Sequence, residues 1–202
     1  VTPVYNFRNK LIGYVANRAH HAEIGGTRPG SMPPDAQNLA QEGVLIPPMY
    51  LVEQGVPNWS GIASLLQTAP YPTRCLQDNL ADLHAALAAN LLGVRLLQRL
   101  ASTFGLRQVR HYMQQLTAYS AALIKTKLLQ LPDGLYSATE LLDDGTPLAV
   151  AVSVVNGQAI IDFTGTGATH AGNLNATPAI VHSVVLYVLR LLLNEDVPLN
   201  EG

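Results

Sequence analysis

The sequence contains little cysteine and little charge. Its single cysteine, Cys75, excludes a disulfide within the chain, and one thiol fits a reducing compartment such as the cytoplasm. Charged residues make up 13% of the 202 residues and hydrophobic residues 48%, which is an apolar balance for a soluble protein of this size. So thin a charged surface predicts that some apolar area is buried against other protein.

Basic clusters and long apolar runs are also missing. The net charge is -2 and no basic patch is present, so nothing indicates a nucleic-acid partner. Residues 179–193 are the best membrane candidate, but they fall short of the roughly 20 residues needed to cross a bilayer and include His182 and Arg190. We expect a buried helix there and no membrane association. Neither a Gly-x-Ser-x-Gly elbow nor a P-loop ending occurs.

The most unusual stretch of the sequence begins at His20 and His21. The residues that follow, up to Pro34, include a glutamate, three glycines, an arginine and three prolines. Glycine and proline set backbone paths that other residues resist, and histidine with glutamate binds metals or moves protons. No periodic core element needs this mixture, so we expect the chemistry of the protein here.

Spacing alone leaves two interpretations of this stretch open. Adjacent side chains of a strand point to opposite faces, so at most one histidine faces a given metal unless the backbone turns, and two ordinary loop histidines are the simpler interpretation. Gly25, Gly26 and Gly30 suit either a tight loop or a close approach to a ligand. Arg28 could pair with a carboxylate through two hydrogen bonds.

The first third of the chain has strand patterns. Residues 1–5 and 11–18 are rich in β-branched and aromatic residues, and residues 6–10 between them form a turn, which predicts a β-hairpin that leads into the histidines. A long loop punctuated by glycine and proline follows over residues 20–43, and loops of this length are usually functional. Residues 44–51 could form a further strand, confined to a sheet edge by two prolines.

The middle of the chain has helical spacing. Apolar residues recur every three or four positions from Leu80 to Leu100, and a second run extends from Leu106 to Leu129. Gly105 suits the end of the first helix. Two long helices joined by so short a connection predict an antiparallel pair.

The last third returns to strands and ends in a helix. Residues 149–155 and 158–163 flank Asn156-Gly157, the pair that favours a type I′ hairpin turn. Pro178 suits the first turn of an apolar helix. We therefore expect a mixed α+β fold with β-hairpin strands in the N-terminal and C-terminal thirds, a central antiparallel helix pair and an apolar C-terminal helix.

Polar residues near the last predicted strand are further site candidates. Asp162 ends that strand before a glycine-spaced turn, and strand ends often carry functional groups. The amides of Asn173 and Asn175 could orient a ring amide. Turn chemistry explains these residue types almost as well.

Three polar residues open the first long helix. Helix capping and the helix dipole explain Asp78, Asn79 and Asp82 without any functional role.

His170, in the loop after the last strand, is a weak candidate for the functional site.

Four blocks of the sequence resemble the hydantoinase B/oxoprolinase family, and they most resemble its oxoprolinase branch. They stand in the family's order across nearly the whole chain, at residues 20–26 (with 29–33 and 41–43), 78–83 (with 88–90), 162–167, and 172–176 (closing on 196–200). Members of that family are longer on both sides. The resemblance therefore implies that residues 1–202 are an internal fragment of a hydantoinase B/oxoprolinase domain.

The resemblance also implies a divalent metal. Family members hold it with a His-x-x-Asp pair upstream, which would precede Val1, and with one histidine of this doublet. We expect His20 to be the ligand and His21 to be the catalytic group, although the two could exchange roles. Asp162 is the second catalytic candidate. The expected substrate-binding residues are Arg28, Ser31, Asn173 and Asn175.

The reaction implied by the resemblance is the ATP-dependent opening of the lactam ring of 5-oxo-L-proline to L-glutamate. ATP with Mg would be bound by a hydantoinase A-like partner domain or subunit, and we expect an oligomer. N-methylhydantoin hydrolysis and ketone carboxylation are alternatives within the superfamily. A further alternative is an inactive structural fragment that lacks the upstream metal ligands.

Overall fold

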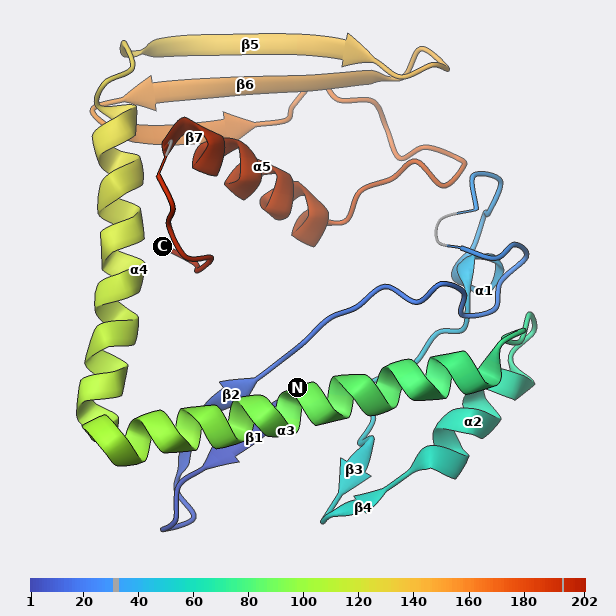
Figure 1. Cartoon of the computed structure of the whole chain (residues 1–202). Helices are drawn as coiled ribbons and strands as arrows, with labels where there is room; N and C mark the ends of the chain where they lie inside the picture. The colour runs from blue at the N-terminus through green and yellow to red at the C-terminus, as the bar shows by residue number, and fades with distance from the viewer. Residues whose placement is uncertain (31–32, 194) are drawn as a thin grey trace. The chain divides into compact units, whose positions relative to one another are not determined.

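The computed structural model describes residues 1–30, 33–193 and 195–202 (Figure 1). The chain divides into two compact units. The first unit comprises residues 1–106 with 171–174, and the second comprises residues 107–170 with 175–202. Each unit is described by itself.

The first unit begins with the expected hairpin. Strand β1 (Thr2–Tyr5) pairs antiparallel with strand β2 (Leu11–Val15). In the turn between them, the Asn6 side chain accepts hydrogen bonds from the backbone of Arg8 and Lys10. The prediction of an N-terminal hairpin is confirmed, and the chain leaves β2 only a few residues before the two histidines.

Helix α3 (Leu76–Phe104) is the long element on which the hairpin rests. The Asn90 side chain, buried in α3, donates to Thr2 Oγ1 across 3.0 Å and accepts from Asn17 Nδ2 across 3.1 Å. A methyl group on Gly93 would lie 2.6 Å from a Val15 methyl group, so the strand packs directly on the helix backbone. These contacts fix the direction in which the chain enters the loop of residues 20–43, called the histidine loop below.

Among the described residues, α3 is also the one helix long and apolar enough to cross a membrane by length and composition alone. Helices in the cores of proteins outside membranes meet the same criteria. The segment singled out from the sequence, residues 179–193, is too short to meet them.

A small hydrophobic core packs against the histidine loop. Val44, Ile62 and Leu66 are buried together, and Ile24 of the histidine loop packs against them. Ile62 and Leu66 belong to helix α2 (Trp59–Thr68), whose N-cap residue is Asn58. Helix α2 was not predicted from the sequence.

The remaining elements of the first unit are short. They are helix α1 (Leu39–Glu42) and the paired strands β3 (Val52–Glu53) and β4 (Val56–Pro57). The strand expected at residues 44–51 is wrong, since no part of that range, all of which the structure describes, is a strand. Pro47 and Pro48 lack the backbone N–H groups that a strand ladder needs.

The second unit contains a three-stranded antiparallel sheet. Its strands are β5 (Gly134–Leu141), β6 (Pro147–Val155) and β7 (Gln158–Asp162), in that order across the sheet. Asn156 and Gly157 have φ angles of 50° and 72°, the positive values that a type I′ turn requires. The predicted C-terminal hairpin is confirmed.

Both expected helices of the second half are present, as α4 (Leu106–Leu128) and α5 (Pro178–Leu193). Helix α3 lies in the first unit and α4, apart from Leu106, in the second, so the antiparallel pairing of α3 with α4 stays a prediction. The expectation that α5 is buried is wrong. Leu193 is buried, but most apolar side chains of α5 are exposed, namely Ile180, Val184, Leu186, Tyr187, Val188, Leu191 and Leu192.

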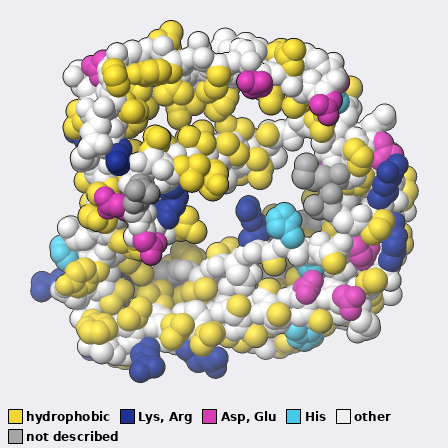
Figure 2. Space-filling model, turned by 45° about the horizontal axis from the view of Figure 1, so that its top comes forward, with side chains coloured by type: hydrophobic (Ala, Val, Ile, Leu, Met, Phe, Trp, Pro, Cys, Tyr) yellow, Lys and Arg dark blue, Asp and Glu magenta, His cyan; other side chains and the backbone are white. Residues whose placement is uncertain are grey.

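The exposed surface is large for the mass. The chain exposes 14416 Å², whereas a compact protein of 21.6 kDa exposes about 9,200 Å² and two separate proteins of half that mass about 11,100 Å². Figure 2 shows apolar side chains spread over the visible face. This surplus agrees with the expectation of contacts to other protein.

Candidate functional site

The histidine loop is anchored by a buried carboxylate, that of Glu23, whose side chain is 8% exposed. Glu23 Oε1 and Oε2 accept hydrogen bonds from five residues. These donors are Gly25 N (3.0 Å), Arg74 N (3.1 Å) and Nη1 (3.3 Å), Cys75 N (3.1 Å), Asn79 Nδ2 (3.2 Å) and the Thr73 hydroxyl. Glu23 thereby ties the loop to the beginning of α3.

The environment of Glu23 keeps it ionised. Burial alone raises the pKa of the carboxyl group, but hydrogen bonds from the Thr73 hydroxyl and from the backbone of Gly25, Arg74 and Cys75 outweigh it and lower the pKa to about 2. A charge held by so many donors is an anchor with a fixed geometry.

The two glycines after Glu23 serve this packing. Gly25 and Gly26 have φ angles of 80° and 81°, and the Arg74 guanidinium donates to the Gly26 carbonyl across 2.7 Å. A methyl group on Gly25 would lie 2.2 Å from the carbonyl oxygen of Tyr71, and one on Gly26 would lie 2.6 Å from that of Glu42. Gly25 and Gly26 therefore form a tight loop, and the close approach of a ligand to these glycines or to Gly30 stays a prediction.

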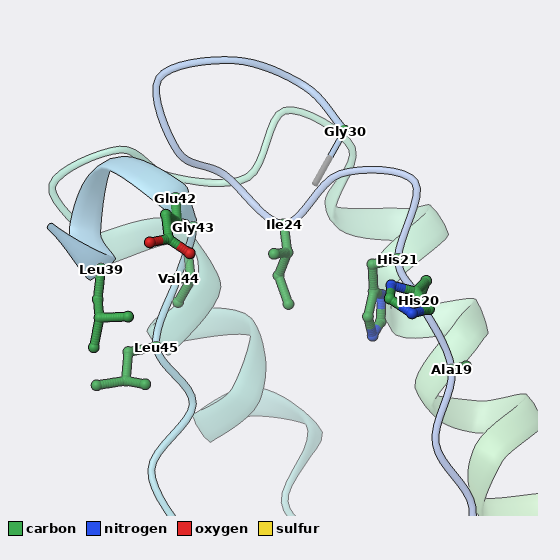
Figure 3. Close-up of a pocket in the computed structure, with 10 residues that line it drawn as sticks. All are labelled: Ala19, His20, His21, Ile24, Gly30, Leu39, Glu42, Gly43, Val44 and Leu45. Carbon is green, nitrogen blue, oxygen red and sulfur yellow. The ribbon is translucent and has the colours of Figure 1, made fainter. Parts of the chain in front are cut away.

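His20 and His21 line a cavity of about 310 Å³ (Figure 3). The two imidazoles lie on one side of it and Leu39 and Leu45 on the other. His20 is exposed, and its ring makes no hydrogen bond within the described ranges of the chain. The side chain of His21 is 18% exposed, and its Nδ1 is buried 3.4 Å from Asp82 Oδ2 without forming a hydrogen bond. The histidines therefore differ, with one open to a ligand and one facing a carboxylate.

The donors present do not complete a metal site by themselves. No group of three or more His, Cys, Asp or Glu side chains suited to a metal occurs in residues 1–30, 33–193 and 195–202, whereas a protein-bound zinc ion takes three or four protein ligands. The exposed ring of His20 and the imidazole of His21 are nitrogen donors of the right chemistry. They could contribute to a site whose other ligands come from outside these ranges.

Arg28 lies in the loop but not in the wall of the cavity. Its Nη2 pairs with Asp35 Oδ2 across 2.9 Å, and the two side chains are 60% and 61% exposed. Exposed pairs of this kind contribute about 0–1 kcal/mol, so Asp35 can release Arg28 at little cost. The expected role of Arg28 in substrate binding stays a prediction, and Ser31 lies outside the described residues.

Asn173 and Asn175 lie in different units. Asn173, in the first unit, donates to the carbonyl of Pro33 across 3.2 Å and so holds the far end of the histidine loop. Asn175, in the second unit, accepts from His170 N across 2.8 Å and donates to its carbonyl across 2.9 Å. Both amides have a structural use, and their roles toward a substrate stay predictions.

Asp162 organises the turn after β7. Its Oδ1 accepts from Thr164 N across 2.8 Å and from the Thr164 hydroxyl across 2.7 Å, and these bonds lower the pKa of the carboxyl group. A carboxylate that stays charged at low pH makes a poor general acid. The expected catalytic role of Asp162 stays a prediction.

Comparison with known proteins covers the whole chain. The sequence profile described as hydantoinase B/oxoprolinase matches residues 1–202. The chain belongs to the hydantoinase B/oxoprolinase family. The resemblance drawn from the four sequence blocks is thereby confirmed.

Several proteins similar to this chain carry enzyme names. It is 37% identical to 5-oxoprolinase 1 of Arabidopsis thaliana over 226 residues and 37% identical to 5-oxoprolinase of Saccharomyces cerevisiae over 214 residues. Each match covers 100% of this chain, and the chain spans 18% and 17% of the two relatives. The crystal structure of ATP-dependent caprolactamase from Pseudomonas jessenii matches with a TM-score of 0.77 and 27% identity, covering 89% of this chain and 31% of that one.

The contacts that the first turns of α3 make with the histidine loop were not predicted from the sequence. Helix capping and the helix dipole are the interpretation of Asp78, Asn79 and Asp82 from the sequence alone. Asp78 does lie in the first turn of α3, as the dipole favours, but the N-cap position belongs to Cys75, which makes no side-chain cap hydrogen bond. Asn79 is buried against Glu23, and Asp82 faces His21. Their spacing of three residues places both on the helix face that meets the loop, and this was the available signal.

Proposed function

We propose that this member of the hydantoinase B/oxoprolinase family is part of an ATP-dependent cyclic amide hydrolase that opens the lactam ring of 5-oxo-L-proline to L-glutamate. The observation that carries the proposal is the identity of 37%, over the full chain, to proteins named 5-oxoprolinase from a plant and a yeast. The structural likeness to an enzyme named ATP-dependent caprolactamase supports the same class of bond.

A lactam needs activation before water can open it, because amide resonance makes its carbonyl carbon a weak electrophile. Phosphorylation of the amide oxygen by ATP would make that carbon electrophilic and create a good leaving group. We assign the binding of ATP and Mg to a hydantoinase A-like partner domain or subunit. The likeness to a relative named caprolactamase subunit beta, 32% identical over 142 residues and 70% of this chain, supports an assembly of several parts.

The residues of this chain would bind the ring and move a proton. His21, beside the cavity, is the proposed proton-transfer group. Arg28 would bind the substrate carboxylate, and Ser31, Asn173 and Asn175 are proposed to orient the ring. A divalent metal bound by His20 and by ligands outside the described ranges would supply a Lewis acid for the intermediate or the attacking water.

The test is glutamate release by the complete protein with its partner, with ATP and 5-oxoproline. Caprolactam, N-methylhydantoin, and acetone with bicarbonate serve as competing substrates. We expect glutamate release coupled to ATP hydrolysis, and at least a hundredfold loss of kcat in His21→Ala. Turnover of N-methylhydantoin or acetone alone would reject the assignment. Unchanged turnover in both His20→Ala and His21→Ala would favour a structural role for this region.

A further inference from the structure

Asp82 is the acidic side chain that His21 faces. It lies in α3, and its Oδ2 is 3.4 Å from Nδ1 of His21. This nitrogen is buried and has no hydrogen-bond partner in the described part of the chain. A buried polar atom without a partner is costly and rare in folded proteins. The arrangement therefore needs an explanation beyond helix capping.

The ring of His21 is not buried all round. Its side chain is 18% exposed and lines the cavity, whereas Nδ1 is fully covered. The accessible part of the ring thus belongs to other atoms. A carboxylate that accepts a hydrogen bond from Nδ1 would hold the proton on that nitrogen and leave the lone pair on Nε2, the nitrogen that could then accept a proton or bind a ligand.

We propose that Asp82 is a positioning residue that acts through His21, fixing the tautomer and the orientation of its imidazole. The proposal rests on the role given to His21 under the proposed function. At 3.4 Å the pair is longer than a hydrogen bond, and such contacts in catalytic sites often shorten only when substrate is bound.

The contacts of Glu23 fix the position of His21 relative to Asp82. Glu23, two residues after His21, is fixed to the beginning of α3 by Asn79, Thr73 and the backbone of Arg74 and Cys75. Asn79 and Asp82 are three residues apart on the same helix, so the bond that anchors the loop also sets the helix face on which Asp82 stands. The distance between His21 and Asp82 therefore follows from the buried anchor rather than from two free side chains.

A different arrangement would give the same distance. Two ligands of one tetrahedral divalent cation also lie about 3.4 Å apart when each metal–ligand bond is about 2.0–2.1 Å. In that case Asp82 would be a metal ligand itself. The two alternatives differ in the effect of removing the carboxylate. Loss of a metal ligand abolishes metal binding, whereas loss of an orienting group typically lowers metal affinity or activity 10–100-fold.

The experiment compares Asp82→Asn with Asp78→Asn in the complete protein. Asp78 is an exposed residue one turn earlier in α3, so its variant loses the same charge from the same helix without touching His21. We expect Asp82→Asn to lower kcat 10–100-fold with KM changed less than threefold, and Asp78→Asn to leave both unchanged. Asp82→Asn with wild-type kcat would overturn the proposal.

A double-mutant cycle shows whether Asp82 acts through His21. In a His21→Ala background, Asp82→Asn should have no further effect on kcat. Independent, multiplying effects would overturn the proposal. So would loss of metal in Asp82→Asn as complete as in a variant that removes a ligand, measured by metal analysis of the purified proteins.

The same cycle scored on the thermal midpoint requires neither substrate nor metal. We expect the two substitutions to be coupled, so that the shift in the double variant differs from the sum of the single shifts. Additive shifts would overturn the contact itself. If no cyclic amide is cleaved but the midpoint cycle shows coupling, the proposed function fails while the pairing of Asp82 with His21 stands.

Discussion

The side-chain amide of Asn79 donates a hydrogen bond to Glu23 Oε1 across 3.2 Å, joining residues 56 positions apart in the sequence. Both side chains are buried. This bond belongs to the set that anchors the histidine loop to α3, and it makes the geometry of the candidate site depend on a contact far from the histidines along the chain.

Replacing Glu23 by Gln should weaken the anchor in a pH-dependent way. The folded-state pKa of Glu23, about 2, lies below the ordinary value of 4.5. The ionised carboxylate therefore contributes about 3 kcal/mol above pH 4.5, and this contribution is lost as the pH falls toward 2. The difference between wild type and Glu23→Gln should accordingly be large at pH 6 and small near pH 2.

Hydrogen exchange in residues 20–30 and 70–80 measures this local stability, with protection factors corrected for intrinsic exchange at each pH. Glu53→Gln is the matched control, because Glu53 is exposed in β3 of the same unit and should change protection by less than about 0.5 kcal/mol. A wild-type to Glu23→Gln difference that does not change with pH would contradict the prediction.

Gly25 and Gly55 separate two costs of adding a methyl group. Both have positive φ angles, 80° and 83°, but a methyl group on Gly25 would meet the Tyr71 carbonyl at 2.2 Å, whereas one on Gly55 meets nothing within 4 Å. Gly55→Ala should cost about 1–2 kcal/mol for the backbone conformation alone, and Gly25→Ala should cost several kcal/mol more. The thermal midpoints of the two variants test this, and equal shifts would contradict it.

Local signals made the hairpins and long helices predictable. Asn156-Gly157 specifies a type I′ turn through its own backbone preferences, and the leucine spacing after Leu80 specifies a helix within a few turns. The strand expected at residues 44–51 failed because prolines remove ladder donors, and there Val44 packs into the small core instead.

The anchor at Glu23 could not be predicted in the same way. Its partners Arg74, Cys75 and Asn79 are 51, 52 and 56 residues away, and no periodicity in the sequence connects them. The residue type at position 23 suggested chemistry, whereas the structure uses it to hold the loop. Sequence patterns identified the region of the site but not the contacts that give it shape.

The chain comprising residues 1–202 alone should self-associate. Its exposed surface exceeds the value for two separate compact halves by about 3,000 Å², and α5 exposes most of its apolar side chains. Analytical ultracentrifugation and binding of an apolar dye test this expectation. A monomer at high concentration that leaves the dye unbound would contradict it.

Removal of the two histidines should remove metal from the complete protein. We expect a divalent metal at close to one equivalent in the wild type, and little in the His20→Ala/His21→Ala double variant, because at least one of these nitrogens is proposed as a ligand. Elemental analysis measures it. His182→Ala, at an exposed position in α5, is the control and should keep its metal. Full metal content in the double variant would refute the assignment, and residues 1–202 alone should bind the metal weakly.

Arg28→Ala should discriminate between two lactams. 5-Oxoproline carries a carboxylate and caprolactam does not. The Arg28 side chain is 60% exposed in this structure, so the proposed contact with the substrate carboxylate reaches the strength of a buried charge pair, about 2–5 kcal/mol, only where the bound substrate and the partner cover it. In that bound state Arg28→Ala should raise the Michaelis constant for 5-oxoproline more than tenfold and leave any turnover of caprolactam unchanged. Asp35→Ala removes the other half of the Arg28–Asp35 pair and frees the guanidinium. The Michaelis constant of this variant for 5-oxoproline should therefore not rise. An unchanged Michaelis constant for 5-oxoproline in Arg28→Ala would exclude Arg28 from the substrate site. An equal rise of the Michaelis constant for both lactams would mean that the substitution disturbs the loop rather than a contact with the carboxylate.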